Sequence, residues 1–206
     1  MPYPTVSGAY GLIPINLIGG QVFASATRQI PIGSGSATSI FFGDVVKLLS
    51  TGLLDKDVAT TTATPVGVFL GCSYTDPTYG KTFRQSYTAN TVASDIVGYV
   101  QDDPDALFKC AVMVGQTTAV GTVTRANVGE NAVLSQGTGN STTGNSGVGI
   151  SATTATTNTF PIRIIDVIAE TSPAGFPASF TEVVVKWNEP TTGAVGGHQY
   201  RQATGI

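Results

Sequence analysis

Residues 180–187 read Phe180-Thr181-Glu182-Val183-Val184-Val185-Lys186-Trp187. Side chains alternate between the two faces of a β-strand, so Val183, Val185 and Trp187 share one face and their neighbours share the other. β-Branched and aromatic residues occupy the first face, as is typical of a strand that covers a core. The stretch therefore predicts a half-buried strand.

Similar patterns extend outward from this strand over most of the chain. In residues 107–114, Phe108, Cys110, Val112 and Val114 are expected to share a buried face. No segment keeps a helical period of 3.6 residues over three turns. Further strand-like stretches lie at residues 40–49, 65–71, 96–101 and 160–168. These patterns predict an all-β fold.

The composition supports the same fold class and narrows the function. The chain has 206 residues with 25 Gly and 11 Pro, which favour turns, and it is rich in Thr, which favours strands. Only 11% of residues are charged, against about 25% in an ordinary domain, and the net charge is -3. A nucleic-acid binder needs a basic face, so nucleic acid is not expected as a partner. No apolar run reaches the length of a membrane span, so no membrane partner is expected either.

The first 37 residues are apolar but rich in proline. Arg28 is the first charged residue, and the run at residues 12–18 carries no charge. Proline interrupts helices, so we expect residues 1–37 to form an extended N-terminal arm. The β-rich body is expected at residues 38–188, followed by an extended C-terminal tail at residues 189–206.

An apolar arm with no core of its own must cover the body or another molecule. Both alternatives are open, and we favour contact with a partner. The residues expected at an interface with a partner molecule or with another subunit are Tyr10, Leu12, Ile13, Ile15, Leu17, Ile18, His198 and Tyr200.

The sequence offers few residues that could form a catalytic or metal-binding site. His198 is the single histidine, and no acidic residue or cysteine lies near it in sequence to complete a base or metal site. Neither a phosphate-binding loop around Lys81 nor a nucleophile elbow around Ser146 has its required glycines. We therefore expect no enzyme, no catalytic residues and no cofactor.

Two further groups of residues could in principle bind metal or form a disulfide. Asp102, Asp103 and Asp105 fit a capped turn better than a calcium site, because three carboxylates supply too few ligands. No metal site is therefore predicted. Cys72 and Cys110 lie in apolar runs and are expected to be buried free thiols. Nothing at the start of the chain reads as a secretory signal, so synthesis in the cytoplasm is expected.

Several segments resemble known viral proteins. The runs 43–48 and 65–69 are similar to the small β-barrel of head-decoration, or cement, proteins of tailed bacteriophages. Longer stretches resemble virion structural proteins of marine tailed phages. These stretches are 10–20, 71–77, 102–108 and 196–200.

The resemblance implies a small β-barrel or β-tulip-like unit at residues 38–89 and a second β unit at residues 90–188. It further implies a capsid decoration protein on the exterior of the virion. The expected partners are the major capsid protein and neighbouring copies of the chain, for instance in a homotrimer. The alternatives are a tail or baseplate component and, from the aromatic and Thr content, a carbohydrate-binding adhesion module.

Overall fold

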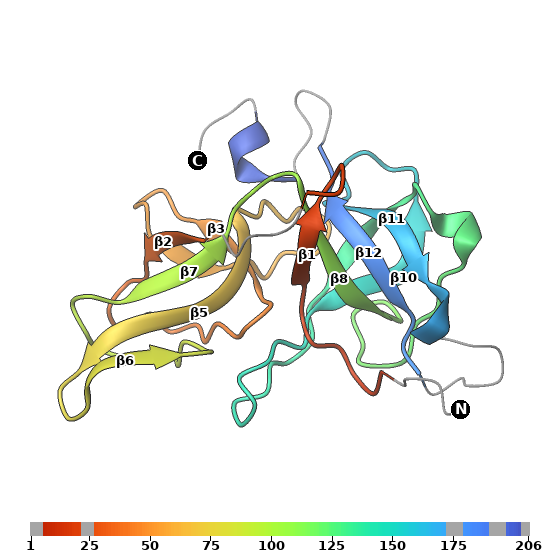
Figure 1. Ribbon diagram of the computed structural model, residues 1–206. Helices are drawn as coiled ribbons and strands as arrows, with labels where there is room; N and C mark the ends of the chain where they lie inside the picture. The colour runs from red at the N-terminus through yellow and green to blue at the C-terminus, as the bar shows by residue number, and fades with distance from the viewer. Residues whose placement is uncertain (1–5, 22–26, 172–178, 190–196, 203–206) are drawn as a thin grey trace.

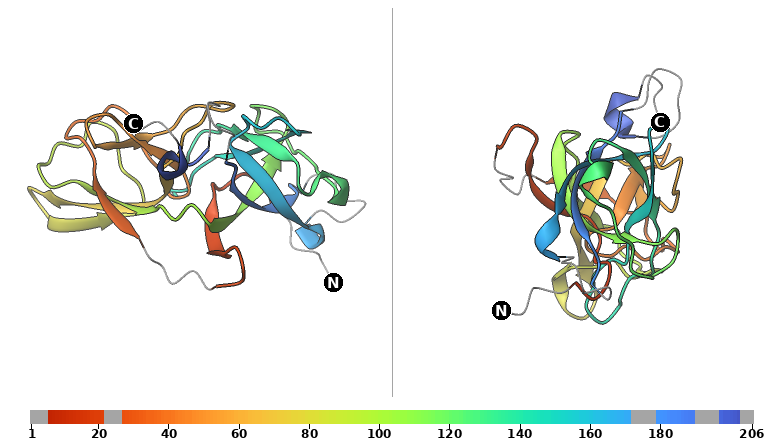
Figure 2. Two further views of the ribbon diagram at one scale, coloured as in Figure 1. Left: turned by 90° about the horizontal axis from the view of Figure 1, so that it is seen from above. Right: turned by 90° about the vertical axis from the view of Figure 1, so that its right-hand side faces the viewer.

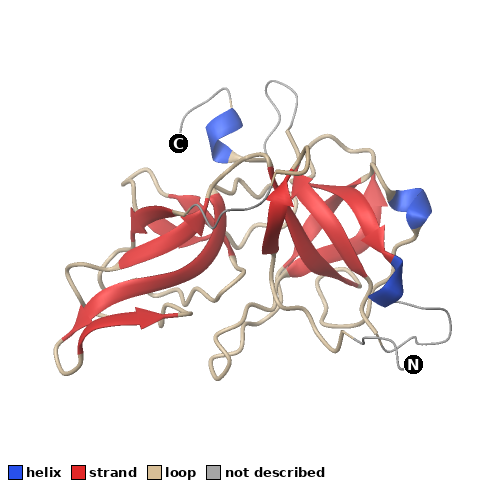
Figure 3. Cartoon of the chain, in the orientation of Figure 1, coloured by secondary structure: helices blue, strands red, loops and turns tan. Residues whose placement is uncertain are grey.

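The computed structural model of the protein describes residues 6–21, 27–171, 179–189 and 197–202 (Figure 1). Nearly all regular structure in this part of the chain is β-strand (Figure 3). The helical segments are single 3-10 turns: η1 (Arg125–Asn127), η2 (Ala169–Thr171) and η3 (Gln199–Arg201). The prediction of an all-β fold is confirmed.

Five strands close into a barrel. Their order around the ring is β8 (Ala106–Met113), β10 (Gly149–Ala155), β9 (Asn131–Ser135), β11 (Ile162–Ile168) and β12 (Glu182–Trp187). The ring closes because β8 pairs with β10 and also with β12. A strand has two edges, and β12 occupies one edge of β8 over residues 107–111. The other edge is shared by β10 and by β1 (Ile13–Leu17), which pairs with residues 106–109.

A second sheet lies beside the barrel in both Figure 1 and Figure 2. Its strands run in the order β2 (Arg28–Pro31), β7 (Val97–Gln101), β5 (Gly67–Asp76), β3 (Val45–Leu48) and β4 (Leu54–Lys56), and β6 (Gly80–Arg84) also pairs with β5. A single bridge between Ile32 and Leu54 links the two ends of this order. The sheet therefore curls around its own core.

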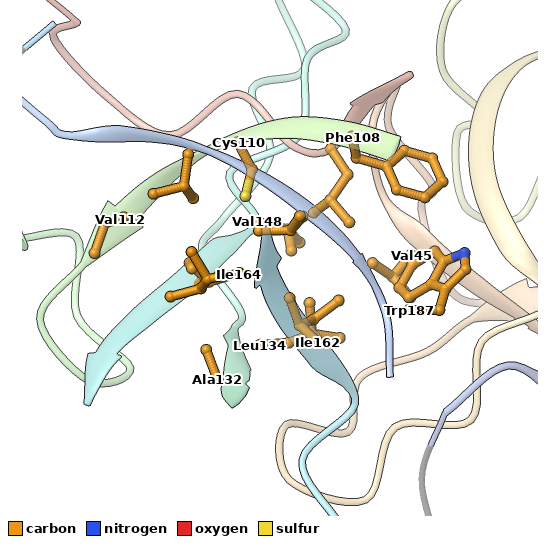
Figure 4. Close-up of a cluster of buried hydrophobic side chains, with 14 of the residues drawn as sticks. Val45, Phe108, Cys110, Val112, Ala132, Leu134, Val148, Ile162, Ile164 and Trp187 are labelled. Carbon is orange, nitrogen blue, oxygen red and sulfur yellow. The ribbon is translucent and has the colours of Figure 1, made fainter. Parts of the chain in front are cut away.

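The alternation of side chains places the predicted faces correctly in the barrel. Val183, Val185 and Trp187 are fully buried, and Phe108, Cys110 and Val112 meet them from β8 (Figure 4). The rings of Phe108 and Trp187 lie 5.0 Å apart. Val114 follows the end of β8 and is exposed, so the buried face ends at Val112 and the prediction for Val114 is wrong.

A second cluster of apolar residues forms the core inside the curled second sheet. Phe69, Val100 and Tyr87 are fully buried there, and Cys72 is almost so. Both Cys72 and Cys110 are buried free thiols, as the sequence predicts. Burial raises the pKa of the Cys72 thiol to about 11, which keeps it protonated and unreactive at neutral pH.

The unit boundaries differ from the sequence prediction. The closed barrel is formed mainly by residues 106–187, whereas the strands within 38–89 belong to the second sheet. The boundary expected at residue 90 is also misplaced, because β7 pairs with β2 and β5. Pairing partners far apart in sequence leave no local signal, so the alternation identifies strands without assigning them to a sheet.

The described part of the expected N-terminal arm is built into the body. β1 pairs with β8 of the barrel and β2 pairs with β7 of the second sheet. Between these two units, the Gly11 N–H donates to the Val148 carbonyl and the Leu12 N–H to the Gly43 carbonyl, each at 2.9 Å. Residues 1–5 and 22–26 of the expected arm lie outside the described residues.

Gly11 lets this segment pass close to Gly43, where there is no space for a side chain. Its φ is +90°, and a Cβ would lie 2.6 Å from the Gly43 carbonyl oxygen. Gly19 has a similar φ of +97° but open space around it.

We expect Gly11→Ala to lower the free energy of unfolding by more than about 2 kcal/mol, because backbone strain and a backbone clash add together. Gly19→Ala should cost about 1 kcal/mol from strain alone. Urea unfolding followed by circular dichroism measures both. Equal losses in the two variants would show that residues 11–12 are not held tightly between the two units.

Candidate interaction surface

The loop at residues 102–105 joins β7 of the second sheet to β8 of the barrel. The Ile18 N–H donates to the Asp105 carbonyl at 3.0 Å, directly after β1. The Arg201 guanidinium, from the C-terminal segment, lies 2.7 Å from the Asp105 carboxylate. Segments from both ends of the chain thus meet on this loop.

Asp102 connects the same loop to the second sheet. Its carboxylate lies 2.7 Å from Nε of Arg28 and accepts a hydrogen bond of 3.0 Å from the Tyr200 hydroxyl. The Arg28 guanidinium also lies over the Tyr200 ring, 5.1 Å from its centre. A charged group, an aromatic ring and a carboxylate therefore hold β2, the loop and η3 together.

The carboxylates of this loop are bonded within the protein. Asp103 accepts a hydrogen bond of 2.8 Å from the backbone N–H of Asp105, which is the turn that the sequence favours. Within the described residues, no group of three His, Cys, Asp or Glu side chains is placed to hold a metal ion. The acidic cluster works here as a structural junction.

Two of the predicted interface residues face the protein's own barrel. Leu12 is fully buried in the barrel core. Tyr10 is half-buried, and its hydroxyl donates to the Glu182 carboxylate, which also pairs with Lys109 at 3.0 Å. Lys109 lies over the Tyr10 ring, and burial together with Glu182 raises the pKa of Tyr10. The prediction that Leu12 faces a partner is wrong, because Leu12 is fully buried in the barrel core. Tyr10 is bonded within the protein through its hydroxyl group, and its part in an interface stays a prediction.

The strand β1 divides its apolar side chains between the core and the surface. Ile13 and Leu17 are partly buried, and Leu17 packs against the barrel core. Ile15 is 38% exposed and Ile18, directly after the strand, is 47% exposed. The register with β8 shifts between Pro14 and Asn16, so Ile15 lies at a bulge on an edge strand.

The prediction that His198 lies at an interface is also wrong, because this residue is only 1% exposed. Its Nδ1 accepts a hydrogen bond of 3.3 Å from the Tyr200 N–H, so His198 caps the start of η3. The segment before and after it is anchored by N–H groups of Gly197 and Gln199, which donate to the carbonyls of residues 63 and 65 at 3.1 and 2.8 Å. Residues 197–202 of the expected tail therefore dock on the body, while 190–196 and 203–206 lie outside the described residues.

Tyr200 remains 41% exposed beside a shallow hollow of about 530 Å³. The hollow is lined by Thr27, Arg28, Gln101, Asp102, Asp103, Pro104 and Tyr200. The exposed predicted residues are thus Ile15, Ile18 and Tyr200, and the loop at 102–105 links Ile18 to Tyr200. The sequence does not predict that Arg28 and Arg201 belong with them, because the loop carboxylates that they contact, Asp102 and Asp105, lie 74 and 96 residues away.

Comparisons with protein families, with curated proteins and with solved structures found no match to this chain. In the described part of the chain, no helix has the length and apolar character needed to cross a membrane.

The burial of His198 makes stability depend on pH. Burial lowers the pKa of His198 from 6.5 to about 4. The Val66 backbone and the charges of Asp102 and Asp103 act in the opposite direction, and Arg201 acts in the same direction as burial. The unfolded chain therefore binds a proton between about pH 6.5 and pH 4 that the folded chain does not, so the stabilisation is complete above 6.5 and is lost as pH falls through this window.

We expect the wild-type protein to lose stability more steeply between pH 6.5 and pH 4 than His198→Asn, which does not titrate there. Urea unfolding at a series of pH values gives both slopes, and the other acidic groups contribute equally to each. Parallel slopes would contradict a neutral, buried imidazole.

Proposed function

We propose that this protein decorates the outer surface of a tailed-phage head and stabilises it by binding the major capsid protein. The proposal rests on the resemblance of several segments to phage virion proteins, and on the nature of the surface. A surface with few charges lacks the repulsion that usually keeps proteins apart, which suits a molecule packed among many neighbours. Contacts with neighbouring copies, as in a homotrimer, are part of the proposal.

The observation that carries the proposal is the pair of exposed isoleucines on and after β1. Ile15 and Ile18 are held by a strand that already pairs with β8, so their order does not have to be gained on binding. Pro14 lacks an N–H and the bulge at Ile15 breaks the regular edge, so a partner strand would pair poorly here. The expected contact is therefore made by side chains, with the isoleucines entering an apolar hollow of the partner.

The energy of one such contact is modest. Burying the rest of each isoleucine contributes about 1 kcal/mol at about 25 cal/mol per Å² of apolar area. Many copies on one closed shell add these contributions, and each contact favours the assembled state over the dissociated one. Modest single contacts thus suffice to stabilise a head.

The test is binding of the purified protein to heads that lack it. The double variant Ile15→Asp/Ile18→Asp should bind at least tenfold more weakly, since two carboxylates would have to leave water. Val92→Asp is the matched control, because Val92 is 77% exposed on a loop of the second sheet. Co-sedimentation with heads measures binding, and circular dichroism checks folding.

Equal binding by the double variant and the control would show that β1 does not contribute to the interface. Co-sedimentation of the wild-type protein with tails instead of heads would replace decoration by a tail or baseplate role.

A further inference from the structure

The strand β6 has one edge without a partner strand. It pairs with β5 alone, and residues 81–84 form no backbone hydrogen bond with any other segment that the structure describes. The β5–β6 hairpin extends away from the barrel in Figure 1, and the left view of Figure 2 shows it at the opposite end of the molecule. An unpaired edge offers a row of N–H and C=O groups to a further strand.

The usual features that prevent pairing at an exposed edge are missing from β6. Proline and bulges are two of these features, and β1 has both of them. The sequence of β6 contains no proline, and its register with β5 runs from Gly80 to Arg84 without a shift. The backbone of β6 is therefore regular enough to accept another strand.

The two cationic side chains of β6 also leave this edge free. A lysine often prevents pairing at an exposed edge, but Lys81 is drawn across β5 by an ion pair of 3.1 Å with Asp95, which lies two residues before β7. On the other face of the hairpin, Nε of Arg84 donates to the hydroxyl group of Tyr74 on β5 at 3.0 Å. Both side chains thus lie over β5 and not over the open edge.

Phe83 provides an apolar surface beside the same edge. Its ring is stacked on the ring of Tyr99 from β7, with centres 6.5 Å apart, and this contact holds it in place across β5. The side chain is nevertheless 70% exposed, although aromatic side chains usually contribute by being buried. A strand added beside β6 would cover part of this ring.

We propose that β6 pairs antiparallel with β6 of a second copy of this chain, so that the second sheets of the two copies become one continuous sheet. A two-fold axis at Thr82 places Thr82 opposite the same residue of the second copy, Lys81 opposite Phe83 and Arg84 opposite Gly80. Neither cation then faces a like charge, which would disfavour the pairing. The methylene groups of Lys81 can cover the exposed part of the Phe83 ring.

The charges at the end of the hairpin favour a second copy as the partner. Of the described ionic groups, none forms a salt bridge with Arg84 or with Asp76. Asp76 pairs with Gly80 on the hairpin, so in the two-fold arrangement it lies one strand beyond the glycine that faces Arg84. Both side chains are on the same face of the sheet, and glycine leaves the space between them open. The pairing does not depend on the binding to phage heads proposed above.

The first experiment is sedimentation equilibrium of the full chain over a range of concentrations. The wild-type protein should form a reversible dimer. Thr82→Lys should weaken the dimer at least tenfold, because it places two like charges directly opposite each other. Val58→Lys is the control, since Val58 is 63% exposed on the loop after β4, and it should dimerise as the wild type does. Circular dichroism verifies the fold of each variant.

The second experiment tests the register with disulfides. Residues directly opposite each other have Cβ atoms about 5 Å apart, close enough for a disulfide after a small shift. Thr82→Cys should therefore form a covalent dimer under mild oxidation, measured by electrophoresis without reducing agent. Lys81→Cys should react at least tenfold more slowly, because it faces Phe83 and not its own copy. The wild-type protein should not react, since Cys72 and Cys110 are buried.

The proposal is overturned if the wild-type protein remains monomeric up to millimolar concentration, or if Thr82→Lys dimerises as strongly as Val58→Lys. It is also overturned if Thr82→Cys and Lys81→Cys form covalent dimers at equal rates. The disulfide measurement decides the question if Thr82→Lys fails to fold.

Discussion

The pairing of β8 with three other strands is the constraint on which the rest of the structure depends. One edge of β8 receives β12 and closes the barrel, while the other edge is divided between β10 and β1. The same strand buries Phe108, Cys110 and Val112 in the barrel core. Its start follows the loop at residues 102–105, where the two sheets and the C-terminal segment are joined. Loss of β8 would therefore open the barrel and release β1 at once.

Local patterns in the sequence predicted the strands and their faces but not the sheets to which the strands belong. Val183, Val185 and Trp187 could be assigned to a core because alternation is a local property. The assignment of β1 to the barrel and β2 to the second sheet depends on partners about 70 to 95 residues away, which leave no trace in a short window. The same reason explains why Leu12 and His198 were expected at the surface: their burial is created by distant residues.

The loop at 102–105 shows how a charged cluster can be misleading when it is considered alone. Three acidic residues in four positions suggest a cation, yet Asp102 and Asp105 are bonded to Arg28, Tyr200 and Arg201. These partners could not be predicted from the spacing of the acidic residues. The turn capped by Asp103 could be predicted, because the hydrogen bond that forms it joins Asp103 to Asp105, only two residues away. Here the charged residues of the loop join segments that lie far apart in the sequence.

A docked strand places different demands on a partner than a free arm does. A free arm gains affinity by covering a large area but must lose conformational entropy on binding. β1 is already ordered, and its proline and bulge disfavour a further strand, so its exposed isoleucines present a small, preformed surface. A partner for it needs an apolar hollow of matching shape.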